Sequence, residues 1–322
     1  NMILSKLDKR HLPTGNEIGT VIDGNELVQS YVEFLTCLPE SSMSGLRVLV
    51  DAANGSAAYL AARVWNPFKA DVRFINCSPD GANINRDCGS TNPSRLADEV
   101  VRGKYHVGFA YDGDGDRCIA VDEKGNVLSG DHIMAIMASD MAKHGRLARD
   151  TVVGTVMANL GLEKYLSSCG ITLLRTPVGD RFVLEEMDRG GYTLGGEQSG
   201  HIIFGDILPA GDGMLTSLLL SGVLARSGRN LSELASVVKE TPQILVNVKS
   251  QFPRQVVKSS GVQQAIKRVS EDLAGTGRVL VRPSGTEPVV RIMVESQDGT
   301  LAGKCVDYLE SVITKQAGTA DD

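Results

Sequence analysis

The 322-residue sequence carries 33 lysines and arginines against 39 aspartates and glutamates, a formal net charge of −6 at pH 7. No lysine- or arginine-rich cluster stands out, so nucleic acid is not an expected partner. The longest apolar stretch, residues 214–225, contains polar residues and is too short to span a membrane. It therefore predicts a buried helix and no membrane association. A chain of this length predicts two or three domains.

The cysteines are scattered without a C-x-x-C pair, at positions 37, 77, 88, 118, 169 and 305. A zinc site or a disulfide framework would need closer or more regular spacing. Reduced thiols in a cytoplasmic protein are the expected state.

An approximate internal repeat organises the first two thirds of the chain. A strand-like run at 47–50 leads through Asn54-Gly55 into a helical run, and a second strand-like run at 151–153 leads through Asn159 into another. Each unit continues with a β-rich segment and a glycine loop, at 71–75 with Gly81 and at 171–174 with Gly179. Strand–helix–strand alternation predicts an α/β fold, with tandem related α/β domains, mainly parallel mixed sheets and a core in each domain.

An acidic loop, residues 112–117, lies between two apolar runs at 106–111 and 118–121. Its sequence, Asp112-Gly-Asp114-Gly-Asp116-Arg117, places a carboxylate at every second position. Like charges this close repel one another unless a cation neutralises them. Hard oxygen ligands on a short flexible loop suit Mg²⁺. The position after a strand is where α/β sheets usually hold ligands.

The acidic loop is open to two other interpretations. A Ca²⁺-binding EF-hand also begins with acids at positions 1, 3 and 5, and Glu123 falls at position 12. However, Arg117 occupies position 6, where the EF-hand turn needs glycine, and residues 118–121 are strand-like. The other interpretation is an acidic, solvated turn without a ligand.

A glycine loop, residues 195–201, reads Gly-Gly-Glu197-Gln198-Ser199-Gly-His201 and is followed by an apolar run at 202–204. Its carboxylate, amide, hydroxyl and imidazole can donate and accept hydrogen bonds to several sugar hydroxyls at once. A plain glycine-rich turn would explain the same pattern without a ligand.

The region after residue 241 changes character. A strand-like run at 243–249 and a helical run at 262–269 precede two β-rich runs at 278–281 and 289–294, and a terminal helix is expected over 303–315. An arginine loop, residues 282–288, joins the two β-rich runs. Arg282, two hydroxyls and a glycine that lets N–H groups approach an anion predict a phosphate cradle. A simple hairpin turn is the alternative.

Together the three loops, in this order, resemble the α-D-phosphohexomutase family, most closely its bacterial phosphoglucosamine mutases. In that family a DGDGDR loop holds Mg²⁺, a GE-x-SGH loop contacts the sugar, and an R-x-SGTEP loop holds the substrate phosphate. The resemblance covers essentially the whole chain after about residue 10.

This resemblance implies a role for each matching residue. Asp112, Asp114 and Asp116 would coordinate the metal. Arg117 and His201 would lie beside the transferred phosphoryl group as catalytic residues. The residues that would bind the substrate are Gly179, Asp180, Glu197 and Ser199 at the sugar, and Arg282, Ser284, Gly285 and Thr286 at the phosphate that is not transferred.

The sequence departs from the family at the nucleophile. The family carries a phosphorylated serine in a loop resembling T-A-S-H-N-P within an amino-terminal domain, and no such string occurs in these residues. The opening Asn1-Met2 and the polar stretch 5–11 resemble the connector that follows that domain. We therefore interpret the chain as a phosphohexomutase without its first domain, inactive by itself.

The expected domains are a connector at 1–25, an α/β metal-binding domain at 26–130, an α/β sugar-binding domain at 131–240 and a C-terminal α+β phosphate-binding domain at 241–322. The expected activity of the parent is interconversion of glucosamine 6-phosphate and glucosamine 1-phosphate, an intramolecular phosphotransfer. Phosphomannomutase or phosphoglucomutase activity, and a non-catalytic phosphosugar-binding fragment, remain as alternatives. A phosphorylated hexosamine is the expected partner, and the oligomeric state stays open, with a homodimer as one option.

Overall fold

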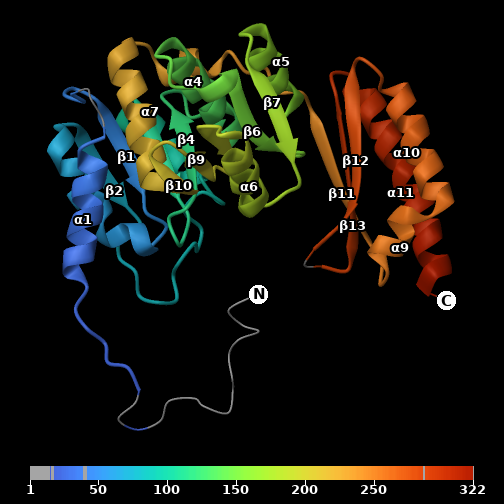
Figure 1. The fold of residues 1–322 in the computed structure, drawn as a ribbon, viewed down its shortest axis with the longest axis horizontal. Helices are drawn as coiled ribbons and strands as arrows, with labels where there is room; N and C mark the ends of the chain where they lie inside the picture. The colour runs from blue at the N-terminus through green and yellow to red at the C-terminus, as the bar shows by residue number, and fades with distance from the viewer. Residues whose placement is uncertain (1–14, 16–17, 39–41, 286, 322) are drawn as a thin grey trace.

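The computed structural model describes residue 15 and residues 18–38, 42–285 and 287–321. These residues form three sheets in chain order, with helices around them (Figure 1). The predicted α/β class, with two tandem α/β domains and a C-terminal α+β domain, is confirmed. Most of the connector expected at 1–25 lies outside the described residues. Of the helices in the described part, none combines the length and apolar character needed to cross a bilayer.

The first domain contains a five-stranded sheet in the order β2-β1-β3-β4-β5. β1 is parallel to β2 and β3, whereas β4 is antiparallel to β3 and β5. β3 and β4 are buried along their whole length, as apolar strands covered on both faces must be. The elements are α1 (Asn25–Thr36), β1 (Arg47–Asp51), η4 (Ser56–Tyr59), α2 (Ala61–Trp65), η5 (Asn66–Phe68), β2 (Asp71–Ile75), α3 (Ser94–Gly103), β3 (Val107–Tyr111), β4 (Cys118–Asp122) and β5 (Val127–Leu128).

The second domain repeats this topology. Its sheet has the order β10-β9-β8-β6-β7, so β6 and β7 take the places of β1 and β2. Both sheets are mixed, as predicted, although parallel pairings make up half of each sheet and not most of it. The elements are α4 (Gly130–Lys143), η6 (Ala148–Asp150), β6 (Thr151–Thr155), α5 (Leu160–Ser168), β7 (Thr172–Thr176), α6 (Asp180–Gly190), β8 (Leu194–Gly196), β9 (Ile202–Phe204), β10 (Leu208–Gly211), α7 (Gly213–Ser227) and α8 (Leu231–Ala235).

The sequence predicted a core in each of the first two domains. Each has a small cluster of buried side chains of its own, but their main hydrophobic core is shared. The helix α7 follows the second sheet in the chain but packs against β3 and β4 of the first. Ser217 of α7 lies 2.7 Å from the hydroxyl of Tyr111, which also accepts a hydrogen bond from Trp65 Nε1 at 3.3 Å. One cluster of buried side chains therefore runs from Val32 to Val238.

The C-terminal domain has a core of its own. Its antiparallel sheet has the order β11-β13-β12, and its three helices cover the face that points away from the other domains (Figure 1). The terminal helix extends beyond the predicted 303–315, because Ala317 is still buried. The elements are β11 (Gln243–Lys249), α9 (Pro253–Lys258), α10 (Ser260–Asp272), β12 (Gly277–Pro283), β13 (Val289–Ser296) and α11 (Gly299–Asp321).

The hairpins β3–β4 and β8–β9 occupy equivalent places in the two domains and touch through their backbones. The Cys118 N–H donates to the carbonyl of Gly200 at 3.0 Å, and Arg117 pairs with His201 in an isolated antiparallel bridge. Gly200 has φ +94°, and an added Cβ would overlap the Cys118 carbonyl. Only glycine allows so close an approach in this conformation.

Gly200→Ala should therefore lower the free energy of unfolding by about 1–3 kcal/mol, because it adds strain at positive φ and forces the hairpins apart. Thermal unfolding of the chain measures the effect. Gly299→Ala is the matched control, since an added Cβ would have no neighbour within 4 Å and the φ of Gly299 is not positive. Equal stability of the two variants would contradict the close contact between the hairpins.

Candidate active site

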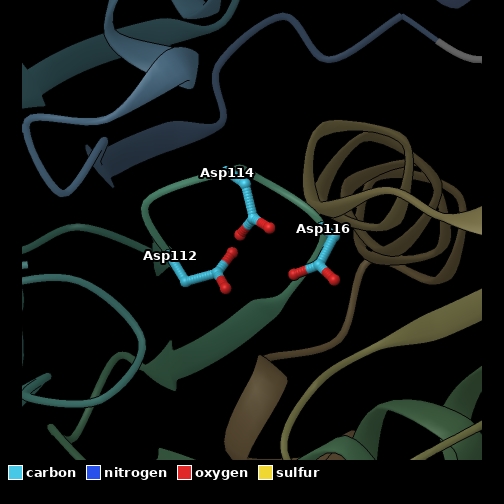
Figure 2. Close-up of side chains that lie close together, drawn as sticks. All are labelled: Asp112, Asp114 and Asp116. Atoms are coloured by element: carbon cyan, nitrogen blue, oxygen red, sulfur yellow. The ribbon is translucent and has the colours of Figure 1, made fainter. Parts of the chain in front are cut away.

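The acidic loop joins β3 to β4, as the sequence predicted from the flanking apolar runs. Its three carboxylates point toward a common centre (Figure 2), and one oxygen from each lies within 4.8 Å of the others. Asp112 is buried, Asp116 is half-buried and Asp114 is exposed. Gly115, at φ +80°, lets the loop turn sharply enough to bring them together.

An arginine and a histidine side chain flank this cluster. Arg117 donates from Nε to Asp112 Oδ2 at 2.6 Å and from its backbone N–H to Asp112 Oδ1 at 3.1 Å. His201 Nδ1 lies 3.0 Å from Asp116 Oδ2. Arg117 and His201 therefore fix the outer two carboxylates and come from the two hairpins that touch.

The donor set fits a divalent metal ion. Asp116 Oδ1 is buried and has no hydrogen-bond partner among the described residues, although Arg117 Nε lies 3.5 Å away. A buried carboxylate oxygen without a donor is costly unless a cation or water satisfies it. Three carboxylate oxygens on one short loop, with room on the exposed side, are the ligands that Mg²⁺ prefers.

The glycine loop joins β8 to β9, the connection equivalent to the acidic loop. Glu197 Oε1 accepts a hydrogen bond from the Gly179 N–H at 3.0 Å, which brings Gly179 and Asp180, the first residue of α6, beside the loop. Ser199 is exposed. Four of the predicted sugar-contacting residues are thus brought together, next to His201 and the acidic loop.

Asp131, which the sequence analysis missed, lies beneath the glycine loop. Its Oδ2 accepts from the Asn159 N–H at 2.8 Å and from Gln198 Nε2 at 3.4 Å. Its Oδ1 is buried without a hydrogen-bond partner in the described part of the chain. Burial raises the pKa of Asp131 to about 6. The available signal was an acidic residue in the first turn of the largely buried helix α4.

The arginine loop joins β12 to β13 in the C-terminal domain. Arg282 lies directly opposite Arg291 of β13 in the antiparallel register. Like charges opposite each other destabilise a sheet. Burial, and then the charge of Arg291, lowers the pKa of Arg282, and Arg291 Nε is buried without a hydrogen-bond partner among the described residues. Arg291 Nη2 already pairs with Glu287 Oε2 at 2.6 Å, so an anion between the two guanidinium groups would satisfy Arg282 and the remaining Nε of Arg291.

The other predicted phosphate ligands lie in the turn that follows Arg282. The Ser284 N–H donates to the Val289 carbonyl at 2.9 Å, and Gly285 comes next in the exposed turn. Thr286 lies outside the described residues. Arg291 was missed because the sequence alone does not give the register that places it opposite Arg282.

Comparisons with known proteins agree along most of the chain. Family models of phosphoglucomutase/phosphomannomutase match three segments: domain II at residues 29–125, domain III at 129–241 and the C-terminal domain at 245–311. A protein of Brevibacillus brevis named phosphoglucosamine mutase is 48% identical over 304 residues, which is 94% of this chain and 68% of the relative. One of Lactobacillus delbrueckii with the same name is 45% identical over 98% of this chain and 70% of its own length.

Solved structures show the same fold at lower identity. A phosphoglucomutase/phosphomannomutase family protein of Burkholderia thailandensis has a TM-score of 0.74 at 23% identity, over 90% of this chain and 64% of that one. N-acetylphosphoglucosamine mutase of Aspergillus fumigatus, solved with GlcNAc-6P and magnesium, has a TM-score of 0.73 at 21% identity, over 89% of this chain and 70% of that one. The three family models and the bacterial relatives show that the chain belongs to the phosphoglucomutase/phosphomannomutase family of phosphosugar mutases, which are intramolecular phosphotransferases.

Proposed function

We propose that this chain forms the metal-, sugar- and phosphate-binding part of a phosphoglucosamine mutase. The activity would interconvert glucosamine 6-phosphate and glucosamine 1-phosphate. The observation that carries the proposal is the direct backbone contact between the acidic and glycine loops, which sets three convergent carboxylates beside polar groups that could hydrogen-bond a sugar. The names of the relatives support glucosamine as the sugar.

Asp112, Asp114 and Asp116 would hold Mg²⁺ at the acidic loop. When bound, the ion would neutralise charge on the phosphoryl group during transfer. Arg117 pairs with Asp112 through Nε and Nη2, and would turn its remaining N–H groups toward a phosphoryl oxygen. His201, held by Asp116, would donate or accept a proton beside the transferred group.

The substrate would lie between the glycine and arginine loops. Glu197, Ser199, Gly179 and Asp180 would hydrogen-bond the sugar hydroxyls. The resting phosphate would bind between the two guanidinium groups of Arg282 and Arg291, with Ser284, Gly285 and Thr286 closing around it.

The nucleophile would come from outside these 322 residues, since the sequence has no T-A-S-H-N-P string. A phosphoserine would transfer its phosphoryl group to the free sugar hydroxyl, which gives a bisphosphate and a serine hydroxyl. After the bisphosphate reorients, the serine oxygen would take the phosphoryl group from the other end, and the isomeric monophosphate would leave.

The domain division follows the same reasoning. We propose a connector at 1–25, the metal-binding domain at 26–130, the sugar-binding domain at 131–240 and the phosphate-binding domain at 241–322. We also propose a cytoplasmic location, which the six free cysteines support.

A coupled mutase assay with a hexose 1,6-bisphosphate activator tests the activity. We expect turnover of glucosamine 6-phosphate by a longer protein in which the family's serine loop precedes these residues, and none by the 322-residue chain. Faster turnover of mannose or glucose phosphates than of glucosamine 6-phosphate would show that glucosamine phosphate is not the substrate. Metal-dependent turnover by the chain alone would require a nucleophile among its own serines, and Ser199 would be the first to substitute.

Asp114→Asn should greatly weaken Mg²⁺ binding, because it removes one of three anionic ligands from the loop. Isothermal titration calorimetry with MgCl₂ measures the affinity. Asp98→Asn, an exposed carboxylate of α3 away from the loop, is the matched control and should bind like the parent. Tight Ca²⁺ binding with seven oxygen ligands would instead favour the EF-hand interpretation.

Arg282→Ala should weaken binding of inorganic phosphate about tenfold or more, since a charge-assisted hydrogen bond contributes about 1.5–3 kcal/mol. Titration followed by calorimetry or by NMR shifts of β12 and β13 gives the affinity. Lys267→Ala, which removes an exposed cation of α10, serves as the control. Unchanged phosphate affinity in Arg282→Ala would favour the interpretation of the arginine loop as a simple hairpin turn.

A further inference from the structure

An ion pair of the C-terminal domain hydrogen-bonds the segment that follows β6 in the second domain. Arg278 of β12 and Glu295 of β13 are cross-strand partners, with Arg278 Nε 2.6 Å from Glu295 Oε2. Arg278 also donates from Nη1 to the Val156 carbonyl at 2.8 Å and from Nη2 to the Ala158 carbonyl at 2.7 Å. Two of the three donating nitrogens of the guanidinium group therefore bond across the junction, while Nε pairs with Glu295 inside the C-terminal sheet.

Glu295 bonds the same segment through its other carboxylate oxygen. Its Oε1 accepts from the Leu160 N–H, the first residue of α5, at 2.7 Å. The carboxylate is fully buried. The pair thus hydrogen-bonds two carbonyls and one N–H group of residues 156–160, the segment that follows β6. We call Arg278 and Glu295 the junction clamp.

This segment, residues 156–160, lies on the side of the glycine loop. It follows β6, which pairs with β8, and β8 leads directly into the glycine loop. Asn159 in the same segment accepts from the Thr241 N–H at 2.9 Å and donates to the Thr241 carbonyl at 2.9 Å, where the chain enters the C-terminal domain. Its own N–H donates to Asp131, which holds Gln198 of the glycine loop.

The same segment also reaches the phosphate side. Met157 lines a cavity of ≈ 130 Å³ together with Arg282 and Arg291. One short segment, held by the clamp, therefore contacts both the support of the glycine loop and the surroundings of the arginine loop.

The clamp contributes more to geometry than to stability. Desolvation of a buried ion pair offsets most of its attraction, and apolar residues of similar volume are often equally stable. A planar guanidinium with fixed N–H directions does what apolar residues cannot, because it sets the orientation of the groups it binds. Burial, and then the charge of Arg175, lowers the pKa of Arg278.

We propose that Arg278 and Glu295 are positioning residues that fix the distance and orientation between the arginine loop and the glycine loop, so that one phosphosugar can contact both. The inference rests on the proposed function. A ligand that touches two loops binds tightly only if both are held at the right separation, whereas a ligand that touches one loop is indifferent to that separation.

The test compares ligands that span the junction with ligands that do not. In Arg278→Lys the clamp loses its planar fork but keeps its charge. We expect the Kd of glucosamine 6-phosphate to rise about tenfold or more, while the Kd values of inorganic phosphate and Mg²⁺ stay unchanged. Arg268→Lys, on the exposed side of α10, is the matched control and should change none of the three.

A second variant guards against misfolding. Arg278→Met combined with Glu295→Met replaces the pair with apolar side chains, and we expect it to fold while showing the same selective loss. Equal weakening of phosphate and glucosamine 6-phosphate in both variants would overturn the proposal, because it would indicate general damage to the arginine loop. Unchanged binding of all three ligands would overturn it as well.

A ligand-free measurement separates the clamp from the proposed function. Small-angle X-ray scattering should show a larger radius of gyration for Arg278→Lys than for the parent, because the C-terminal domain is held less tightly. If the unsubstituted chain binds phosphate but not glucosamine 6-phosphate, the proposed function fails. The scattering result alone then decides whether Arg278 and Glu295 hold the C-terminal domain in place. An unchanged radius in that case overturns it.

Discussion

The candidate active site depends on a contact that involves almost no side chain. The hairpins of the two α/β domains meet where the Cys118 N–H bonds to the Gly200 carbonyl, and Gly200 must lack a Cβ for that approach. Because the contact is between backbones, it fixes the acidic loop against the glycine loop whatever side chains each loop carries. Arg117 and His201 pair at the same place, so the groups beside the carboxylates come one from each domain. The shared core and the crossover of α7 hold the two sheets in this relation.

Duplication explains why the two loops meet in this way. The sheets have the same strand order, and each loop is the same connection in its own sheet. Equivalent residues, one position before β4 and β9, therefore pair with each other across the domain boundary. The C-terminal domain is related to neither unit and keeps a separate core, so its position relies on polar contacts at the junction and not on continuous apolar packing. That difference makes directional groups, such as a guanidinium fork, suited to this boundary.

Local pattern was enough to predict the parts of the site that lie within one segment. The acidic loop follows a buried strand because apolar runs flank it on both sides, and the arginine loop joins two strands for the same reason. Arg291 could not be predicted, because its role follows from strand register. The contacts of Asp131 could not be predicted either, because its partners Asn159 and Gln198 lie in two distant segments. The shared core was missed for a related reason, since no periodicity within α7 shows that it packs against an earlier sheet.

The position of Trp65, the single tryptophan of the chain, has an optical consequence. Its indole stacks on Phe109 with ring centroids 5.9 Å apart and donates to the hydroxyl of Tyr111. Tyr111 is the last residue of β3, and the next residue is Asp112. A fluorophore that is fully buried emits in an apolar, rigid environment, and one hydrogen bond and one peptide unit separate it from the first carboxylate of the acidic loop. The protein thus contains an intrinsic reporter, in which ion-induced displacement of that loop is read as a change in emission, without an added label.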